Sequence, residues 1–319
     1  MLDRILKSNS ATTVTFWIVT IVLVLSSFWV ISFVYGQTQD EDEVVVDEAL
    51  SAIYVDYYNS ADQFVSAESY LAMGEYTAQF PQPQNVQILT NMTTTEITGY
   101  MLNHFSAGMG VDCTYCHSLE NFAADEWDDE VAMARKTTAL EHLELTADLN
   151  RNWLTQLAGL TETKRPSGAQ ITCTTCHNGE PLPDPWPEDG PLDEDLRLPL
   201  DADTVFSVEE EGILNVNARK DISLDTVQYN QEVMYHMNTS LGVGCTHCHN
   251  SRYFPSYEGV PAKNYTINML QMSQHLWNNY EETLGGKQPS CYLCHQGAPI
   301  PPGAARSVDV MPDALVANQ

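Results

Sequence analysis

Basic residues are scarce in this 319-residue chain, which has 14 Lys and Arg against 43 Asp and Glu and a formal net charge of −29 at pH 7. Binding to nucleic-acid phosphates requires a cluster of basic side chains. The shortage therefore excludes nucleic acid as an expected partner. The acidity needs no function because it keeps a solvated surface soluble, although it would also attract a cationic partner.

Cysteine is also absent outside four short motifs, which contain all eight cysteines of the chain. Each motif reads Cys-x-x-Cys-His, and the four are Cys113–His117, Cys173–His177, Cys245–His249 and Cys291–His295. A disulfide framework would not require the trailing His. A zinc ribbon would not place His directly after the second Cys four times.

The Cys-x-x-Cys-His pattern is typical of c-type haem attachment, in which both thiols become thioethers and the imidazole binds the iron. Positions i, i+3 and i+4 share one helix face, so all three groups meet the same porphyrin. The sequence thus predicts four covalent haem c groups, attached through Cys113, Cys116, Cys173, Cys176, Cys245, Cys248, Cys291 and Cys294. The predicted axial imidazoles are those of His117, His177, His249 and His295.

The uncharged run Val14–Tyr35 predicts a transmembrane helix, because it can span a hydrocarbon core of about 30 Å. Arg4 and Lys7 precede it and Asp40–Glu43 follows, so the positive-inside rule places the amino end in the cytoplasm and the rest outside. A cleaved signal peptide, with its cleavage site at Val34–Gly36, is the alternative. The run is longer than a signal-peptide core of about 7–15 residues, which favours a retained anchor.

The motifs alternate in two types. Motifs 1 and 3, here the A motifs, share a Gly-Val approach at Gly110 and Gly242 and a Met about a dozen residues ahead of the first Cys. Motifs 2 and 4, the B motifs, share an exit with Gly two residues after the His, at Gly179 and Gly297. Helix-patterned stretches lead into both B motifs. The A-B-A-B order predicts duplication of a two-haem unit.

The sixth iron ligand decides what each haem can do, because an open iron binds substrate whereas Met or a second His makes an electron-transfer centre. Equivalent places in the repeat favour Met101 for haem 1, His142 for haem 2, Met234 for haem 3 and Met269 for haem 4. The competitors are Met109 or His104 at haem 1, His236 or Met237 at haem 3, and Met272 or His275 at haem 4. His247, inside motif 3, is interpreted as a surface or haem-edge residue.

The run Met234–Asn250, the A-B-A-B order and the exits after the B motifs resemble the tetrahaem cytochrome subunit of bacterial photosynthetic reaction centres, over roughly Val86 to Gly303. The resemblance implies an electron carrier with no catalytic site of its own. It would re-reduce the photo-oxidised bacteriochlorophyll special pair with electrons from a soluble donor, a small blue copper protein or a c-type cytochrome. It would dock on the L and M subunits, near the light-harvesting complex, on the periplasmic side of the cell membrane.

The resemblance also implies a mainly α fold, a multihaem cytochrome c with pseudo-twofold duplicated two-haem units, here preceded by one N-terminal transmembrane helix. The predicted segments are a cytoplasmic amino terminus (1–13), the transmembrane helix (14–35), a linker and N-terminal helical segment (36–85), the first two-haem unit (86–190), a connector (191–225), the second two-haem unit (226–303) and a C-terminal tail (304–319). The chain after Pro299 is predicted to be extended and partly disordered.

Three departures from the family pattern matter. No Cys precedes Cys113 to carry a lipid anchor, so the membrane helix is expected to replace it. His142 stands where the family usually has Met, and Gln156 stands where it usually has the second His of haem 4. Haem 2 is therefore expected to be bis-His and haem 4 His/Met, similar to the branch found in filamentous anoxygenic phototrophs.

Two other functions remain as alternatives. A membrane-anchored tetrahaem quinol dehydrogenase also has one amino-terminal helix and four such motifs, but those enzymes are shorter and mostly His-ligated. A multihaem reductase acting on small nitrogen compounds needs an open iron, whereas every haem here has a candidate sixth ligand.

Overall fold

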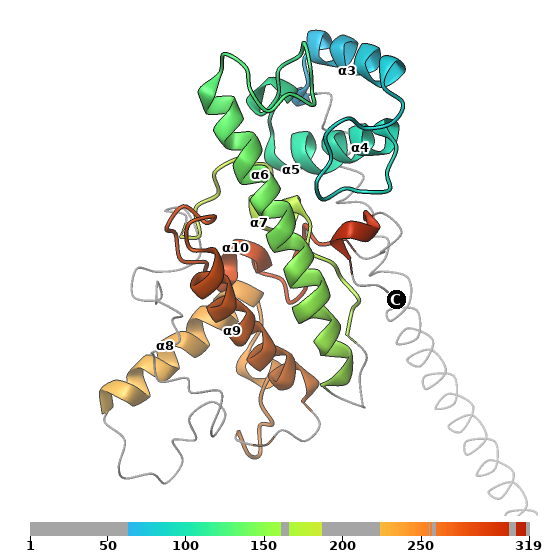
Figure 1. Ribbon diagram of the computed structural model, residues 1–319. Helices are drawn as coiled ribbons and strands as arrows, with labels where there is room; N and C mark the ends of the chain where they lie inside the picture. Colours follow the sequence, from blue (N-terminus) through green and yellow to red (C-terminus); the bar gives the residue numbers. More distant parts are fainter. Residues whose placement is uncertain are drawn as a thin grey trace, which may run out of the picture. The chain divides into compact units, whose positions relative to one another are not determined.

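The computed structural model describes residues 63–160, 166–186, 224–254, 256, 260–305 and 311–316 (Figure 1). The chain divides into two compact units, Met1–Ala49 and Leu50–Gln319, and all described residues belong to the second. None of their helices is both long and apolar enough to cross a membrane. The predicted membrane span, Val14–Tyr35, lies outside the described residues.

Regular structure in the described part of the chain is almost entirely helical, as predicted. The α-helices are α3 (Ala67–Gln79), α4 (Thr94–Tyr100), α5 (Ala107–Met109), α6 (Glu130–Asp148), α7 (Cys173–His177), α8 (Leu224–Leu241), α9 (Pro261–Tyr280) and α10 (Cys291–His295). Two π-helices, η1 (Met101–Ser106) and η3 (Leu149–Trp153), interrupt the α-helical runs. Short 3₁₀ segments are η2 (Cys113–Tyr115), η4 (Leu154–Gly159), η6 (Cys245–His247) and η8 (Asp313–Leu315).

The helices begin where the sequence supplies a cap. Asp129 Oδ1 accepts hydrogen bonds from the amides of Val131 and Ala132, each at 3.0 Å, at the start of α6. Pro261 opens α9, where its missing amide hydrogen costs no helical hydrogen bond. These starts are therefore encoded locally, before any tertiary contact forms.

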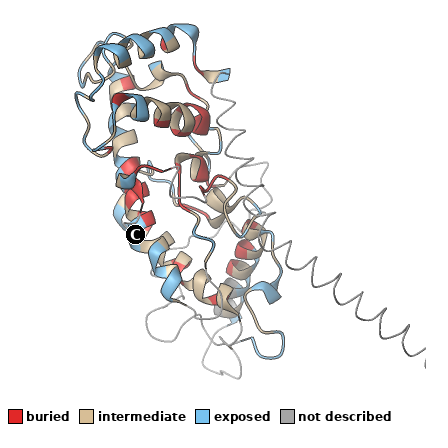
Figure 2. Ribbon diagram, turned by 90° about the vertical axis from the view of Figure 1, so that its right-hand side faces the viewer, coloured by how far each residue is buried: buried red, intermediate tan, exposed pale blue. Residues whose placement is uncertain are grey.

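Three clusters of buried apolar side chains hold the helices together. Figure 2 colours the buried residues, apolar and polar, red along the ribbon. The first joins α4, α6 and the C-terminal residues, the second joins α8 and α9, and the third joins α6, η3 and α9. Their buried members are Leu89, Tyr100, Leu143, Ala147, Ala305, Met311, Leu315 and Val316 in the first, Val233, Met237 and Leu270 in the second, and Leu145, Leu149, Ile171 and Leu276 in the third. Since burial of each large side chain contributes about 1.5–3 kcal/mol, these clusters fix α6 and α9, the helices that lead into the B motifs.

The C-terminal segment 311–316 is packed, so the prediction of an extended, partly disordered tail is wrong there. Leu315 is fully buried. Arg151 donates to the carbonyls of Ala314 at 2.5 Å and Val316 at 3.1 Å, and Asn150 Nδ2 donates to that of Leu315 at 2.9 Å. These donors come from η3, far away in the sequence, and composition alone does not reveal such partners.

Candidate haem-binding sites

The two motif types form different turns. The A motifs are 3₁₀ turns (η2 and η6), and the B motifs are single α-helical turns (α7 and α10). In the A motifs the amides of His117 and His249 donate to the carbonyl of the first Cys, at 2.9 and 3.0 Å. All four motifs are thus helical, as the spacing of the Cys and His residues requires.

Each motif histidine is oriented by one hydrogen bond from Nδ1. The Nδ1 atoms of His117, His177, His249 and His295 each lie 2.9 Å from a backbone carbonyl oxygen. A carbonyl only accepts, so Nδ1 carries the hydrogen and the Nε2 lone pair is left for a metal. A hydrogen bond from the second ring nitrogen to a carbonyl is the usual support of a ligating His. The four imidazoles therefore fit an axial role at haem iron.

The protonation of these histidines suits the same role. Burial and, to a smaller extent, the nearby Lys136 charge lower the pKa of His117 to about 4, and burial lowers that of His177 to about 4. Burial also lowers the pKa of His295. The rings of His117, His177 and His295 are consequently neutral at pH 7, which is the form that binds a metal.

Several of the motif thiols are also shielded from solvent, although Cys245 is exposed. Burial raises the pKa of Cys116 to about 11 and those of Cys173 and Cys291 to about 12. The described residues contain no group of three or more Cys, His, Asp or Glu side chains converging on one point as in a zinc site. The zinc-ribbon alternative thus finds no support there.

A glycine contact joins the A motif to the B motif in each half of the chain. Gly110 has a φ of +67°, and a Cβ on it would lie 2.5 Å from the carbonyl oxygen of Gly179. Gly242 has a φ of +65°, and a Cβ there would collide with the carbonyl of Gly297. The amides of Gly179 and Gly297 in turn donate to the carbonyls of Gly108 and Ser240, both at 2.8 Å. The approach and exit sequences shared by the motifs are therefore surfaces that touch each other.

The two B motifs also meet. Helices α7 and α10 are in contact, and the Sγ atoms of Cys176 and Cys294 lie 3.2 Å apart. Thr172 and Thr175 donate to the carbonyl of Gly303 at 2.7 and 3.1 Å, which holds the chain after motif 4 against α7. These contacts in space connect motif 1 to motif 2, motif 2 to motif 4, and motif 4 to motif 3. The spatial order 1-2-4-3 therefore differs from the order in the sequence.

Motif 1 opens into an apolar cavity that receives its predicted sixth ligand. The cavity is lined by Cys113, Cys116, His117 and Met101, together with apolar side chains of α4, η1 and α6. The competitor Met109 lines it as well. His104 is buried and stacks on Tyr100, with ring centroids 4.2 Å apart. The donor set and the apolar lining fit one haem at motif 1.

At motif 2 the structure brings the two predicted ligands together. The rings of His142 and His177 have centroids 5.7 Å apart and are inclined at 43°. His142 Nε2 lies 2.9 Å from the carbonyl oxygen of Thr283, so ligation through Nε2 would require this contact to open.

At motif 3 the candidate ligands have different surroundings. Met237 is buried in the α8–α9 cluster, and Met234 is partly buried and packs against that cluster. His236 is fully buried, and its Nε2 accepts a hydrogen bond from the Cys291 amide at 3.1 Å. His236 and Met237 are thus buried, whereas Met234 is only half-buried.

At motif 4 the two alternative ligands, His275 and Met272, also have other contacts. His275 Nε2 lies 2.6 Å from Asp148 Oδ2, and Asn279 Nδ2 donates to His275 Nδ1 at 3.0 Å. Met272 packs against the α6–α9 cluster. Met269 is half-buried on α9, and its assignment to haem 4 still depends on the repeat.

The π-helix η1 accounts for a mismatch in the repeat. Met101 lies twelve residues before Cys113, whereas Met234 lies eleven before Cys245. The Ala107 amide donates to the Leu102 carbonyl in the i→i−5 pattern, while α8 remains a regular helix to Leu241. One extra residue in the turn absorbs the difference in spacing.

The helical fold and the histidine-containing turns define a c-type cytochrome. The chain belongs to the family of photosynthetic reaction centre cytochrome C subunits, which it matches over residues 35–185 and 196–267. It is therefore an electron-transfer subunit of a photosynthetic reaction centre, as the resemblance implied. No comparison supports the quinol dehydrogenase alternative.

Three relatives illustrate the similarity. Cytochrome c-554 of Chloroflexus aurantiacus is 29% identical over 304 residues, covering 70% of each chain. The photosynthetic reaction center cytochrome c subunit of Rubrivivax gelatinosus is 28% identical over 259 residues, covering 67% of this chain and 66% of the relative. That of Thermochromatium tepidum is 28% identical over 258 residues, covering 68% of this chain and 60% of the relative.

Proposed function

We propose that the chain binds four haem c groups and delivers electrons from a soluble donor to the photo-oxidised special pair of the reaction centre. The observation that carries this proposal is the set of four motif histidines, each with Nδ1 bonded to a carbonyl and Nε2 available. Haem supplies a one-electron iron couple when bound. The residues of the chain attach it, orient its imidazole ligand and keep water away.

The proposed sixth ligands are Met101, His142, Met234 and Met269 for haems 1 to 4. The cavity at motif 1 supports Met101, and the ring spacing of His142 and His177 supports His142. The hydrogen bonds of His236 and His275 and the burial of Met237 disfavour these competitors, whereas the choice of Met269 over Met272 depends on the repeat.

The matched contacts of the two halves support the proposal that a two-haem unit is duplicated. Gly110 and Gly242 have nearly the same φ and approach equivalent carbonyls. The histidine acceptor lies five residues on in both A motifs, at Phe122 and Phe254, and three residues on in both B motifs.

In this proposal the haem domain stands outside the cytoplasm on the L and M subunits, near the light-harvesting complex. Residues 14–35 anchor it as a single span.

A single flash tests the function. In membranes containing this protein, a c-type haem should be oxidised as the bacteriochlorophyll cation decays, and a soluble blue copper protein or c-type cytochrome should then reduce it. Fast quinol oxidation by the isolated protein in darkness would contradict the proposal. A pyridine haemochrome assay should find four haems per chain, and a count of two or fewer would remove the basis for the relay.

A further inference from the structure

Two of the three lysines in the described part of the chain occupy equivalent places. Lys136 lies six residues before His142 on α6, and Lys263 lies six residues before Met269 on α9. These are the helices that correspond in the repeat. The third lysine, Lys287, is exposed. Because basic residues are scarce in this chain, the pairing of two of them calls for an explanation.

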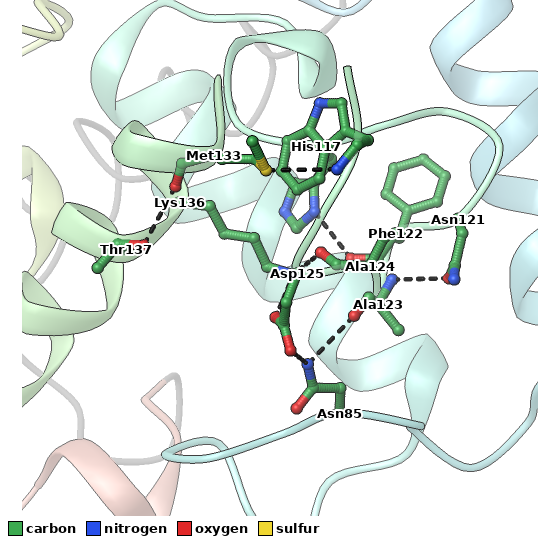
Figure 3. Close-up of polar contacts among 11 residues, drawn as sticks. Asn85, His117, Asn121, Phe122, Ala123, Ala124, Asp125, Met133, Lys136 and Thr137 are labelled. Atoms are coloured by element: carbon green, nitrogen blue, oxygen red, sulfur yellow. Dashed lines mark hydrogen bonds and ion pairs between the residues drawn. The ribbon is translucent and has the colours of Figure 1, made fainter. Parts of the chain in front are cut away.

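Lys136 holds the loop that follows motif 1 (Figure 3). Its Nζ donates to the Ala124 carbonyl at 2.5 Å and lies 3.4 Å from Asp125 Oδ1. Ala124 is two residues after Phe122, whose carbonyl accepts the Nδ1 hydrogen bond of His117. Asn85 Nδ2 adds hydrogen bonds to the Ala123 carbonyl and to Asp125 Oδ2, at 3.1 and 2.7 Å.

Lys263 makes the equivalent contact after motif 3. Its Nζ donates to the carbonyl of Phe254 at 3.1 Å and to that of Ser256 at 3.4 Å. The Phe254 carbonyl also accepts the Nδ1 hydrogen bond of His249. Ser256 follows its motif histidine by seven residues, as Ala124 does. The same loop position is therefore held by a lysine in both halves.

In the B motifs, a tight turn alone holds the carbonyl to which the histidine bonds. Their histidines bond to the carbonyls of Glu180 and Ala298, three residues on. The amides of these residues donate back to the carbonyls of His177 and His295, at 2.9 and 2.8 Å. A three-residue turn closed by its own backbone needs no outside support, whereas a five-residue loop has more freedom to lose its geometry.

Placing an ammonium group in these sites is unfavourable unless hydrogen bonds compensate for lost water. Lys263 is only 5% exposed, and the Lys136 side chain 16%. An apolar side chain would fill either space at lower cost. A charged donor bonds to a carbonyl more strongly than a neutral one does. The lysines therefore suit a task in which the position of a carbonyl matters.

We propose that Lys136 and Lys263 are positioning residues for the axial histidines of haems 1 and 3. Lys263 bonds directly to the Phe254 carbonyl that accepts from His249, whereas Lys136 fixes the loop two residues beyond the Phe122 carbonyl that accepts from His117. The inference depends on the proposed haem sites. It separates the A sites, which need a lysine, from the B sites, which do not.

Four substitutions in the full chain test the proposal: Lys136→Met and Lys263→Met remove donor and charge, whereas Lys136→Gln and Lys263→Gln keep a donor without charge. Haem content is measured first, and low-temperature EPR of the ferric protein then resolves the axial geometry of individual haems. Each Met variant should shift or broaden one of four signals, from haem 1 or haem 3 respectively. Each Gln variant should largely restore that signal, although its haem should titrate at a lower potential because a positive charge is lost.

Lys287→Met is the matched control and should change no signal. Loss of one haem in Lys263→Met or Lys136→Met, with four retained in Lys287→Met, also supports the proposal. Four unchanged EPR signals in both fully loaded Met variants would overturn it, and so would signals that change at haems 2 or 4 instead. Failure of the proposed function would differ, because the unsubstituted protein itself would then lack four haems or flash oxidation.

Discussion

The A and B motifs have the same pentapeptide pattern but are held by different means. Each B motif is an α-helical turn whose histidine bonds three residues on, and the two B motifs pack against each other through Cys176 and Cys294. Each A motif is a 3₁₀ turn whose histidine bonds five residues on, in a loop whose carbonyls accept hydrogen bonds from a lysine of another helix. The comparison teaches that one pentapeptide pattern allows two kinds of turn, and that the residues around the motif determine how its histidine ring is held.

The largest effect should come from breaking the contact between the A and B motifs. Gly242→Ala adds a Cβ that collides with the Gly297 carbonyl at a positive φ. We expect a loss of roughly 2–5 kcal/mol in the free energy of unfolding, from left-handed backbone strain and overpacking together. Chemical denaturation followed by circular dichroism measures it. Gly244→Ala is the control, because its φ is −94° and nothing lies within 4 Å of the added Cβ.

Gly110→Ala should show a similar loss in the first half, against the carbonyl of Gly179. Equal stability of Gly242→Ala and Gly244→Ala would mean that the backbone contact is not needed to hold the two motifs together.

A smaller and more selective effect should distinguish the two B sites. Thioether sulfur raises the potential of haem iron relative to a second imidazole. With His142 at haem 2 and Met269 at haem 4, haem 2 should have the lowest potential of the four. His142→Met should raise that potential, and Met269→His should lower that of haem 4, while the A-site haems stay nearly unchanged. Redox titration of both variants measures this.

Burial and nearby charges also shift potentials, so the reciprocal pair is needed. If the lowest potential does not move in His142→Met, then His142 is not its ligand and the repeat alignment that selected it fails.

The sequence predicts chemistry well where residues close together in the chain carry it. The Cys-x-x-Cys-His spacing predicted helical turns, and Met101 lies in the same cavity as Cys113, Cys116 and His117. The shared approach and exit sequences marked a real relationship, but their contact through Gly110 and Gly179 needed the structure.

The sequence was a poor guide where distant residues cooperate. The lysine contacts were missed, because a lone Lys on a helix usually faces solvent. Aligning Lys136 with Lys263 through the repeat was the available signal. The π-helix η1 and the burial of Leu315 also depend on tertiary packing that local patterns do not encode.

The smallest expected effect tests how the two B-leading helices are joined. Asp148 of α6 accepts hydrogen bonds from His275 at 2.6 Å and Tyr280 at 3.0 Å across the α6–α9 contact, and from Asn152 at 2.7 Å. Burial alone would raise the pKa of Asp148, but these hydrogen bonds outweigh it and lower the pKa below its ordinary value. Asp148→Asn should cost about 1–3 kcal/mol of unfolding free energy at pH 7, because the ionised acceptor is lost.

The pH dependence of that difference identifies its origin. A carboxyl whose pKa is depressed by folding stabilises the protein above its unfolded value of about 3.9, and this contribution is lost as the pH falls through the lower folded value. The stability gap between the native protein and Asp148→Asn should therefore be full above about pH 4 and close in more acidic solution. Denaturation at several pH values measures the gap, with exposed Asp128→Asn as the control. A gap that persists unchanged in acid would assign the effect to packing and not to the carboxylate, and the B-leading helices would then be joined by their apolar contacts alone.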